Sequence, residues 1–162
     1  MATLIWTGGE SATTKTFMTA ANWGGTAPSD NDTLIINSSS DTIGGAATGL
    51  IGITFRVGSG FTGTIGSSTT HLDLDGPLCE FASGGTAAYI TGTWTNFRIT
   101  GGSASPLFLN LKGNASTAIT TLLASRLSGT VTVGSSAAVT TVQMNGSNVG
   151  TIDLASSITG LA

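Results

Sequence analysis

Three ionisable side chains alternate with leucines in one short segment, His71-Leu72-Asp73-Leu74-Asp75. Successive side chains of a β-strand point to opposite faces, so His71, Asp73 and Asp75 share one face at a spacing of about 6.5–7 Å. That spacing lies within the range of the two carboxyl groups in an inverting glycoside hydrolase. The same side chains are cation ligands. The sequence nevertheless favours a solvated outer face, because groups that would stabilise charge developing on a sugar are scarce.

Aromatic residues provide a second group of candidates, in the longest β-rich run, residues 88–100. An outward-facing Tyr89 or Trp94 would stack on sugar rings or anchor a protein interface. Strict alternation puts Trp94 and Phe97 on opposite faces, so we expect a bulge or burial of both faces in this run.

Motifs for covalent, nucleotide or metal chemistry are missing from the sequence. It has no nucleophile elbow, no phosphate-binding loop followed by a helix, and no His/Cys spacing of a metal site. Cys79 is the only cysteine, which excludes an internal disulfide, and we expect it to pack as a small apolar residue. The sequence therefore predicts a protein that is not an enzyme, with no cofactor, no bound metal and no catalytic residues.

The composition limits the classes of partner. Thr (29), Ser (19) and Gly (24) make up close to half of the 162 residues, and charged residues make up 8%, against about 25% in an average protein. The net charge is −3 and the five basic residues are scattered, so no basic patch can neutralise phosphates or anionic lipids. We expect neither nucleic acid nor membrane as a partner.

The first residues indicate where the protein is made. Met1 to Trp6 lack the basic and apolar regions of a secretory signal, and no apolar run reaches the roughly 18 residues that span a bilayer. We expect a protein made in a host cytoplasm without a signal peptide. Because such Thr/Ser/Gly-rich chains usually act outside cells, the expected route out of the cell is release by lysis.

The chain divides into two regions. Residues 1–32 contain Trp6, Trp23, two Gly-Gly pairs and the turn-rich run 28–32, which predict an N-terminal cap or arm. Within it, residues 13–22 are the one candidate for a short helix. Residues 33–162 consist of short β-rich runs separated by Gly, Ser and Asn, and these predict a single β domain.

A short phrase recurs in the second region: an apolar residue, any residue, an apolar residue, and often Gly, Ser or Asn at the exit. It predicts strands with their apolar residues on one face. The phrase occurs at residues 55–58, 72–76, 97–101, 109–113, 131–134, 142–146 and 152–154.

Two architectures fit the spacing of about 11 residues between phrases. Strands could zigzag into an antiparallel sandwich or jelly roll. Alternatively, every second strand returns to the same sheet of a short parallel β-solenoid, in which residues 99, 122 and 144 stack on one sheet and residues 111, 133 and 154 on another. The all-β solenoid is favoured, because its narrow interior needs a stripe of Val, Ile, Leu and Phe and its outside tolerates Thr, Ser and Asn.

The N-terminal residues resemble a known group of proteins. Trp6-Thr7-Gly8-Gly9, then Ala20-Ala21-Asn22-Trp23-Gly24-Gly25 and the apolar run at 34–36, are similar to the opening of autotransporter-associated β-solenoid proteins. This resemblance covers about a fifth of the chain and implies that Trp6 and Trp23 cap the first coil. By size and composition the whole chain looks like a phage capsid decoration (cement) protein, and this likeness implies that the expected location is the virion.

These observations predict a structural role. The last coil of a solenoid exposes an apolar interior and strand edges, and around Leu161 no charged or proline residue terminates it. We expect self-association as a homotrimer that binds a major capsid protein and stabilises the capsid lattice, with Trp6, Trp23, Tyr89, Trp94 and Leu161 as interface candidates. The alternative functions are a glycan-binding fibre or adhesin domain that uses Trp94 and, less favoured, a polysaccharide-active enzyme that uses Asp73 and Asp75.

Overall fold

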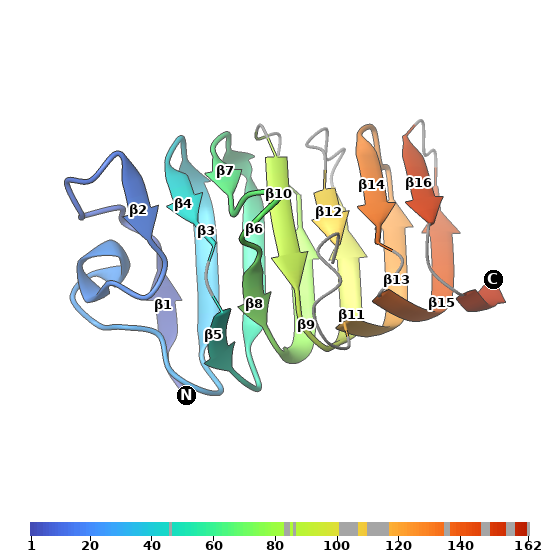
Figure 1. Ribbon diagram of the computed structural model, residues 1–162, viewed down its shortest axis with the longest axis horizontal. Coiled ribbons are helices and arrows are strands. Elements are labelled where there is room, and N and C mark those ends of the chain that lie inside the picture. Colours follow the sequence, from blue (N-terminus) through green and yellow to red (C-terminus); the bar gives the residue numbers. More distant parts are fainter. Residues whose placement is uncertain are drawn as a thin grey trace.

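The computed structural model is a parallel β-solenoid, in which two sheets wind around a common core (Figure 1). It describes residues 1–162 except 46, 83–84, 86, 101–106, 110–116, 135–136, 147–149, 155–157 and 162. Every strand pairing in the described part of the chain is parallel. The predicted solenoid is therefore confirmed, and the antiparallel sandwich or jelly roll is wrong.

The chain alternates between the two sheets. The eight-stranded sheet, here sheet A, has the order β1 (Thr3–Ile5), β3 (Thr33–Ser39), β6 (Thr54–Phe61), β9 (Gly76–Phe81), β11 (Trp94–Ile99), β13 (Thr117–Ser125), β15 (Ala137–Asn145), β17 (Ile158–Leu161). Sheet B has the order β16 (Thr151–Leu154), β14 (Thr130–Val133), β12 (Leu107–Leu109), β10 (Ala87–Thr91), β7 (Thr64–Ile65), β4 (Thr42–Gly44), β2 (Thr14–Thr16). Beside β10, strand β8 (Leu72–Leu74) pairs with β5 (Ala47–Leu50).

The core consists of rows of apolar side chains that stack from coil to coil at the strand spacing of about 4.8 Å. One row in sheet A is buried along its length: Leu4, Leu34, Phe55, Cys79, Phe97, Leu122 and Val142. Each coil adds one residue to each row, so the apolar residues that recur along the sequence are the ones that stack on one another in the core. Cys79 lies in this row as a buried free thiol, as predicted.

The predicted stacking register is confirmed for residues 133 and 154 and for residues 99 and 144, and it is wrong for residue 122, which lies one inward position away from the row of 99 and 144. Leu122 aligns with Phe97 and Val142, whereas Ile99 aligns with Ala124 and, through it, Met144. On sheet B, Val133 aligns with Leu109 and Leu154, and residue 111 lies outside the described residues. The reason is that the coils differ in length: the connections between strands absorb extra residues, so a constant step along the sequence does not fix which residues are neighbours.

The N-terminal segment continues both sheets. Strand β1 pairs with β3 and β2 pairs with β4, so residues 1–32 contribute a first coil. After β2 the chain forms a 3₁₀-helix, η1 (Ala20–Trp23), which ends at Gly24 in the left-handed conformation. The short helix expected over residues 13–22 is thus reduced to its last turn, because the threonines before it extend sheet B.

The β-rich run at residues 88–100 is two strands on different sheets. Gly92, at φ 120°, makes the corner between β10 and β11. Further along, Trp94 and Phe97 both point inward, with two outward residues between them. The next strand repeats this arrangement with Ile119 and Leu122. In place of the expected bulge or two-sided burial, the run has a corner between two strands, followed by two consecutive outward residues that recur at the same register in the next strand.

Candidate functional site

The His71, Asp73 and Asp75 segment lies at β8, on the side of the molecule that sheet B forms. Leu72 and Leu74 point into the core and are fully buried, as the alternation predicts. His71 differs from the expectation, because its side chain is 6% exposed and packs edge-on against Tyr89 at 5.6 Å between ring centroids. The histidine thus belongs to the packing beside the strand and does not share an open face with the two carboxylates.

The two carboxylates differ in their surroundings. Burial and the nearby charge of Asp75 raise the pKa of Asp73 above its usual value. The Asp75 carboxylate accepts a hydrogen bond from the Thr93 backbone N–H and so holds the corner before β11. Within the described residues, no three His, Cys, Asp or Glu side chains come close enough to hold a metal ion. Asp75 is therefore engaged in a turn, whereas Asp73 lies on β8, with one inward residue between the two.

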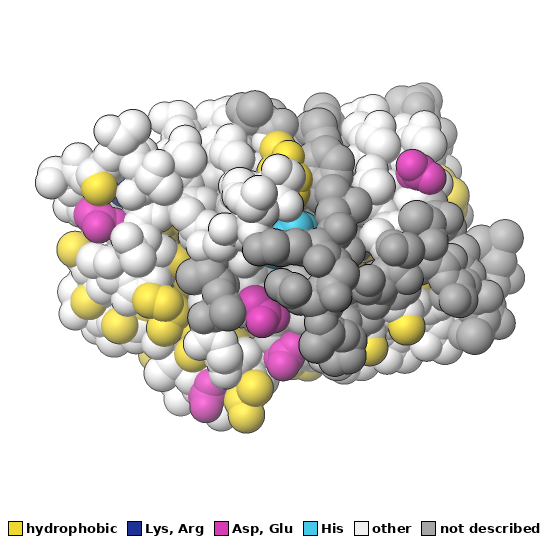
Figure 2. All heavy atoms as spheres, viewed as in Figure 1, with side chains coloured by type: hydrophobic (Ala, Val, Ile, Leu, Met, Phe, Trp, Pro, Cys, Tyr) yellow, Lys and Arg dark blue, Asp and Glu magenta, His cyan; other side chains and the backbone are white. Residues whose placement is uncertain are grey.

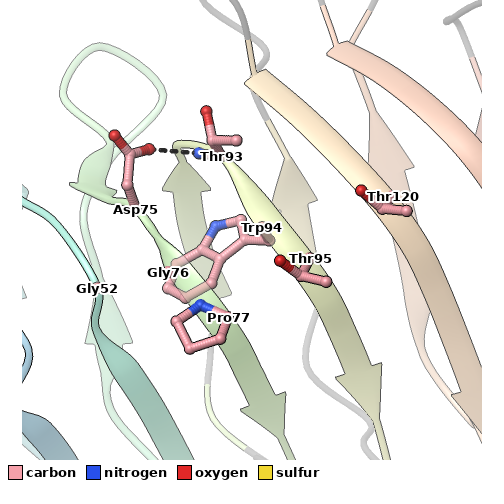
Figure 3. A pocket seen from close by; sticks show the side chains of 8 residues that line it. All are labelled: Gly52, Asp75, Gly76, Pro77, Thr93, Trp94, Thr95 and Thr120. Carbon is pink, nitrogen blue, oxygen red and sulfur yellow. Dashed lines mark hydrogen bonds between the residues drawn. The ribbon is translucent and has the colours of Figure 1, made fainter.

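A shallow hollow of about 550 Å³ lies next to this corner (Figure 3). Asp75 and Thr93 form its rim at one end, Pro77, Thr95 and Thr120 line the rest, and the Trp94 ring lies above Gly76. The lining offers one carboxylate, three hydroxyls and an apolar floor, with no cation and no general base free of the turn. This lining suits weak contacts with neutral groups.

Trp94 is a core residue. Its side chain is fully buried and meets Phe97 edge-on at 6.1 Å. The ring has room because its neighbour in the adjacent strand, Gly76, has no side chain. The indole N–H finds no acceptor among the described residues. A side chain in this position cannot stack on a sugar or anchor an interface, so the surface role considered for Trp94 is wrong.

Tyr89 remains partly accessible. It is half-buried on the outer face of β10. Its ring contacts His71, as described above, which leaves part of one face toward solvent. Leu161 lies in β17, but its side chain is outside the described residues. Of the five interface candidates, Tyr89 is the one whose described side chain is not buried.

Trp6 and Trp23 close the N-terminal end of the core. Their side chains are 5% and 2% exposed, and their rings meet edge-on at 5.0 Å. The ring of Phe17 packs against Trp23, at 5.2 Å between ring centroids, and against Phe55 of β6, at 6.0 Å. The structure thus places both indoles in a buried aromatic cluster over the first coils, where they stabilise the end of the solenoid and are not exposed for an interface.

Buried polar contacts attach this N-terminal cluster. Asp41 accepts a hydrogen bond from the Trp6 indole N–H at 2.9 Å, and Asp32 accepts bonds from the backbone N–H groups of Ala2 and Ser29. Burial alone would raise the pKa of both carboxyls, but these hydrogen bonds outweigh it, and both pKa values are lowered. Both carboxylates therefore favour the folded cap in their charged form.

Glu10 and Asn22 complete the attachment. The Asn22 side chain, fully buried, accepts from the Glu10 backbone N–H at 2.8 Å and donates to the Thr16 carbonyl at 2.8 Å. Hydrogen bonds from Thr16 and Asn22 lower the pKa of Glu10. Sequence analysis missed these roles, because the partners are 6 to 35 positions apart in the chain and only the folded segment brings them together; the only signal was the concentration of Asp and Asn in residues 22–41.

Charge is sparse over the molecule and unevenly placed. On the side seen in Figure 2, which sheet B forms, acidic side chains occur at separate places among neutral ones. Sheet A carries Arg56, Glu80 and Arg98 on neighbouring strands. Among the described residues, none of the helical segments is long and apolar enough to cross a bilayer.

Comparisons with known proteins return no relative. No protein-family model matches the chain, and neither the curated proteins nor the solved structures contain a significant match. The class of protein is therefore given by its fold, a small parallel β-solenoid with an aromatic N-terminal cluster, and its function is argued from that structure alone.

Proposed function

We propose that this β-solenoid is a non-enzymatic structural protein of a virus particle, specifically a phage capsid decoration protein. In this role it binds the major capsid protein as a homotrimer and stabilises the capsid lattice. The observation that carries the proposal is the combination of a rigid two-sheet solenoid with an uncovered, charge-poor outer surface and no convergent catalytic group in the described residues.

The architecture supports such a role physically. Each coil rests on its neighbours through full-length parallel ladders, so the molecule resists bending without needing a large globular core. Its outer positions carry Thr and Asn in many coils, for example Thr33, Thr54, Thr121 and Thr141, which offer methyl and hydroxyl contacts to a partner. Low charge also reduces repulsion between copies that crowd on a lattice.

The direct experiment uses bare capsids of the phage whose genome encodes this chain. Purified protein is mixed with capsids that lack it, and attachment is measured by co-sedimentation. We expect saturable attachment and a higher temperature of capsid disruption. A protein that stays in the supernatant at micromolar concentration, where the capsid is otherwise intact, contradicts the proposal.

The glycan-binding alternative has lost its main residue, because Trp94 is buried. Half-buried Tyr89 is what remains of the aromatic platform, and a single ring of this kind provides little stacking area. The proposal therefore predicts a blank glycan array. A defined oligosaccharide that binds and is lost in Tyr89→Ala would favour the fibre or adhesin function instead.

A further inference from the structure

One row of outward side chains crosses sheet A from coil to coil and differs from the neutral rows beside it. We call it the outer row: Ile5, Ile35, Arg56, Glu80, Arg98, Leu123 and Gln143, each the direct register neighbour of the next. Its centre is charged and its two ends contain apolar residues. The adjacent row has no charged residue and includes Thr33, Thr54, Leu78, Asn96, Thr121 and Thr141.

The charged centre has an excess of positive charge. The Arg56 Nε atom lies 3.4 Å from the Glu80 carboxylate, and Arg98 lies on the strand at the other side of Glu80. Arg56 is half exposed, with a side-chain exposure of 50%. Surface ion pairs of this kind contribute little to stability. The row thus presents two guanidinium groups, two strands or about 10 Å apart, on a chain whose net charge is −3.

The apolar end of the row leads into a small hollow. Ile5 points away from the core, and its side chain is 51% exposed. Beside it, Ile35, Arg56 and Glu80 line a hollow of about 240 Å³ whose floor includes Gly58. A Cβ atom at Gly58 would lie 2.9 Å from the Asn37 carbonyl oxygen, so a residue with a side chain would not fit at the floor of the hollow without a shift of the backbone. The hollow has room for one side chain of a partner, between an apolar wall and a guanidinium group.

We propose that the outer row is the surface by which the protein docks on its partner, and that the partner is a protein surface with carboxylates opposite Arg56 and Arg98 and an apolar side chain in the hollow beside Ile35. This inference rests on the proposed function, in which that partner is the capsid lattice. Arginine is one of the residues in which protein interfaces are enriched. Charge complementarity selects an acidic partner surface, because the row offers two cations and one anion.

A matched pair of charge reversals tests the assignment. Arg98→Glu reverses a charge in the outer row, and Arg126→Glu reverses the charge of an exposed arginine just after β13, outside the row. Both change the net charge equally, so they separate a local contact from a general effect. In co-sedimentation with bare capsids, we expect R98E to weaken attachment about tenfold or more, R56E/R98E to abolish it, and R126E to change it less than about twofold.

Chemical blocking gives a second, independent measurement. The native thiol, Cys79, is fully buried, so a cysteine introduced on the surface is the reactive one. Asn37→Cys lies beside the hollow on sheet A, and Thr130→Cys lies on sheet B; both positions are exposed. After coupling to a polyethylene glycol maleimide, we expect the first variant to lose capsid attachment and the second to retain it. Circular dichroism and thermal unfolding verify that each variant is folded.

The outcomes distinguish the two proposals. Wild-type protein that fails to sediment contradicts the capsid function, and the docking assignment falls with it. If wild-type and R98E sediment equally, or if blocking at residue 37 has no effect, the function stands and the outer row is not the docking surface. If R98E instead dissociates a homo-oligomer while capsid attachment persists, the occupant is a second copy of the chain, and the proposal of an acidic capsid surface is overturned.

Discussion

At the scale of single residues, side-chain size and hydrogen bonding decide how the corners pack. Gly76 leaves space for the Trp94 ring because the register neighbour of Trp94 on this side is a glycine, whereas its neighbour on the other side is Ile119. Asp32 and Asp41 hold the first coil through contacts with residues far away in the sequence. Glycines and carboxylates at these corners are therefore structural, and substitutions there are expected to act on stability.

Gly76→Ala tests the corner. A Cβ atom at this position would lie 1.8 Å from the Ile53 carbonyl oxygen, so the backbone of two coils must shift. We expect a loss of about 1–3 kcal/mol in the free energy of unfolding, measured by urea denaturation. Gly44→Ala is the matched control, because its nearest atom is 3.4 Å away. Equal stability of the two variants would show that the corner is more adaptable than described.

The carboxylates of the N-terminal coil predict a dependence of stability on pH. Because the pKa of Asp32 is lower when folded than its unfolded value near 3.8, its contribution is present above that value and is lost as pH falls through the folded pKa. We expect the Tm to fall steeply below about pH 4, and Asp32→Asn to flatten this fall while lowering the Tm at pH 7.

Asp73 is expected to have the opposite effect on the dependence of stability on pH. Its pKa is raised in the folded state, so the charged form is disfavoured by folding above that pKa. Asp73→Asn is therefore expected to raise the Tm at pH 7 and to leave it unchanged at pH 3, where both side chains are neutral. Thermal unfolding followed by circular dichroism at the two pH values checks this, and a lower Tm at pH 7 would contradict it.

At the scale of elements, the inner strands differ from the ends of the solenoid in what covers them. Each inner strand receives a neighbour on both sides, and its apolar row continues. At the N-terminal end, η1 and the rings of Trp6, Phe17 and Trp23 cover the core of the first coil. Three large rings in contact with one another provide here the apolar cover that a neighbouring coil provides elsewhere.

Trp23→Ala tests the role of this cluster. Its ring is 2% exposed, and its indole N–H donates to the Phe17 carbonyl. Removing it leaves a cavity over the first coil, with an expected cost of about 3–5 kcal/mol and faster proteolysis of the N-terminal segment. Ile5→Ala, at a half-exposed position of the same coil, is expected to cost about 1 kcal/mol or less. Equal costs would mean that the cluster does not cap the core.

At the scale of the whole molecule, parallel winding makes every strand depend on a neighbour one coil away. β11 pairs with β9 and β13, and none of these is adjacent in the sequence. The result is a rigid body with two sheet faces, one of which carries the outer row. Such a body is suited to lie on a surface and to contact copies of itself, which is the physical basis of the proposed assembly.

The oligomeric state is measured by size-exclusion chromatography with light scattering. The proposed trimer predicts a mass of about 48 kDa, three times the 16.0 kDa of one chain. Closed cyclic symmetry of this kind predicts a single species that does not grow with concentration. A monodisperse monomer at micromolar concentration would contradict the trimer, and a species that lengthens with concentration would indicate open, head-to-tail assembly.

The sequence by itself determined the all-β class and favoured the solenoid, because alternation along each short run and its recurrence about every 11 residues are local properties of the chain. It also determined that Cys79, Leu72 and Leu74 would be buried. Parallel pairing of the strands was decided by the tertiary structure. Only the tertiary structure decided which residues are neighbours across coils, because connections of unequal length shift the register, as at Phe97 and Leu122.

The same physical reason separates the correct and incorrect site assignments. Trp94 fits into the core because its register neighbour on the adjacent coil, Gly76, has no side chain. The outer row forms from residues about 20 positions apart, which become neighbours only through the register of the strands. Side-chain direction along one strand follows from the local backbone. Contact between coils depends on how the whole chain winds, and a linear pattern does not contain that information.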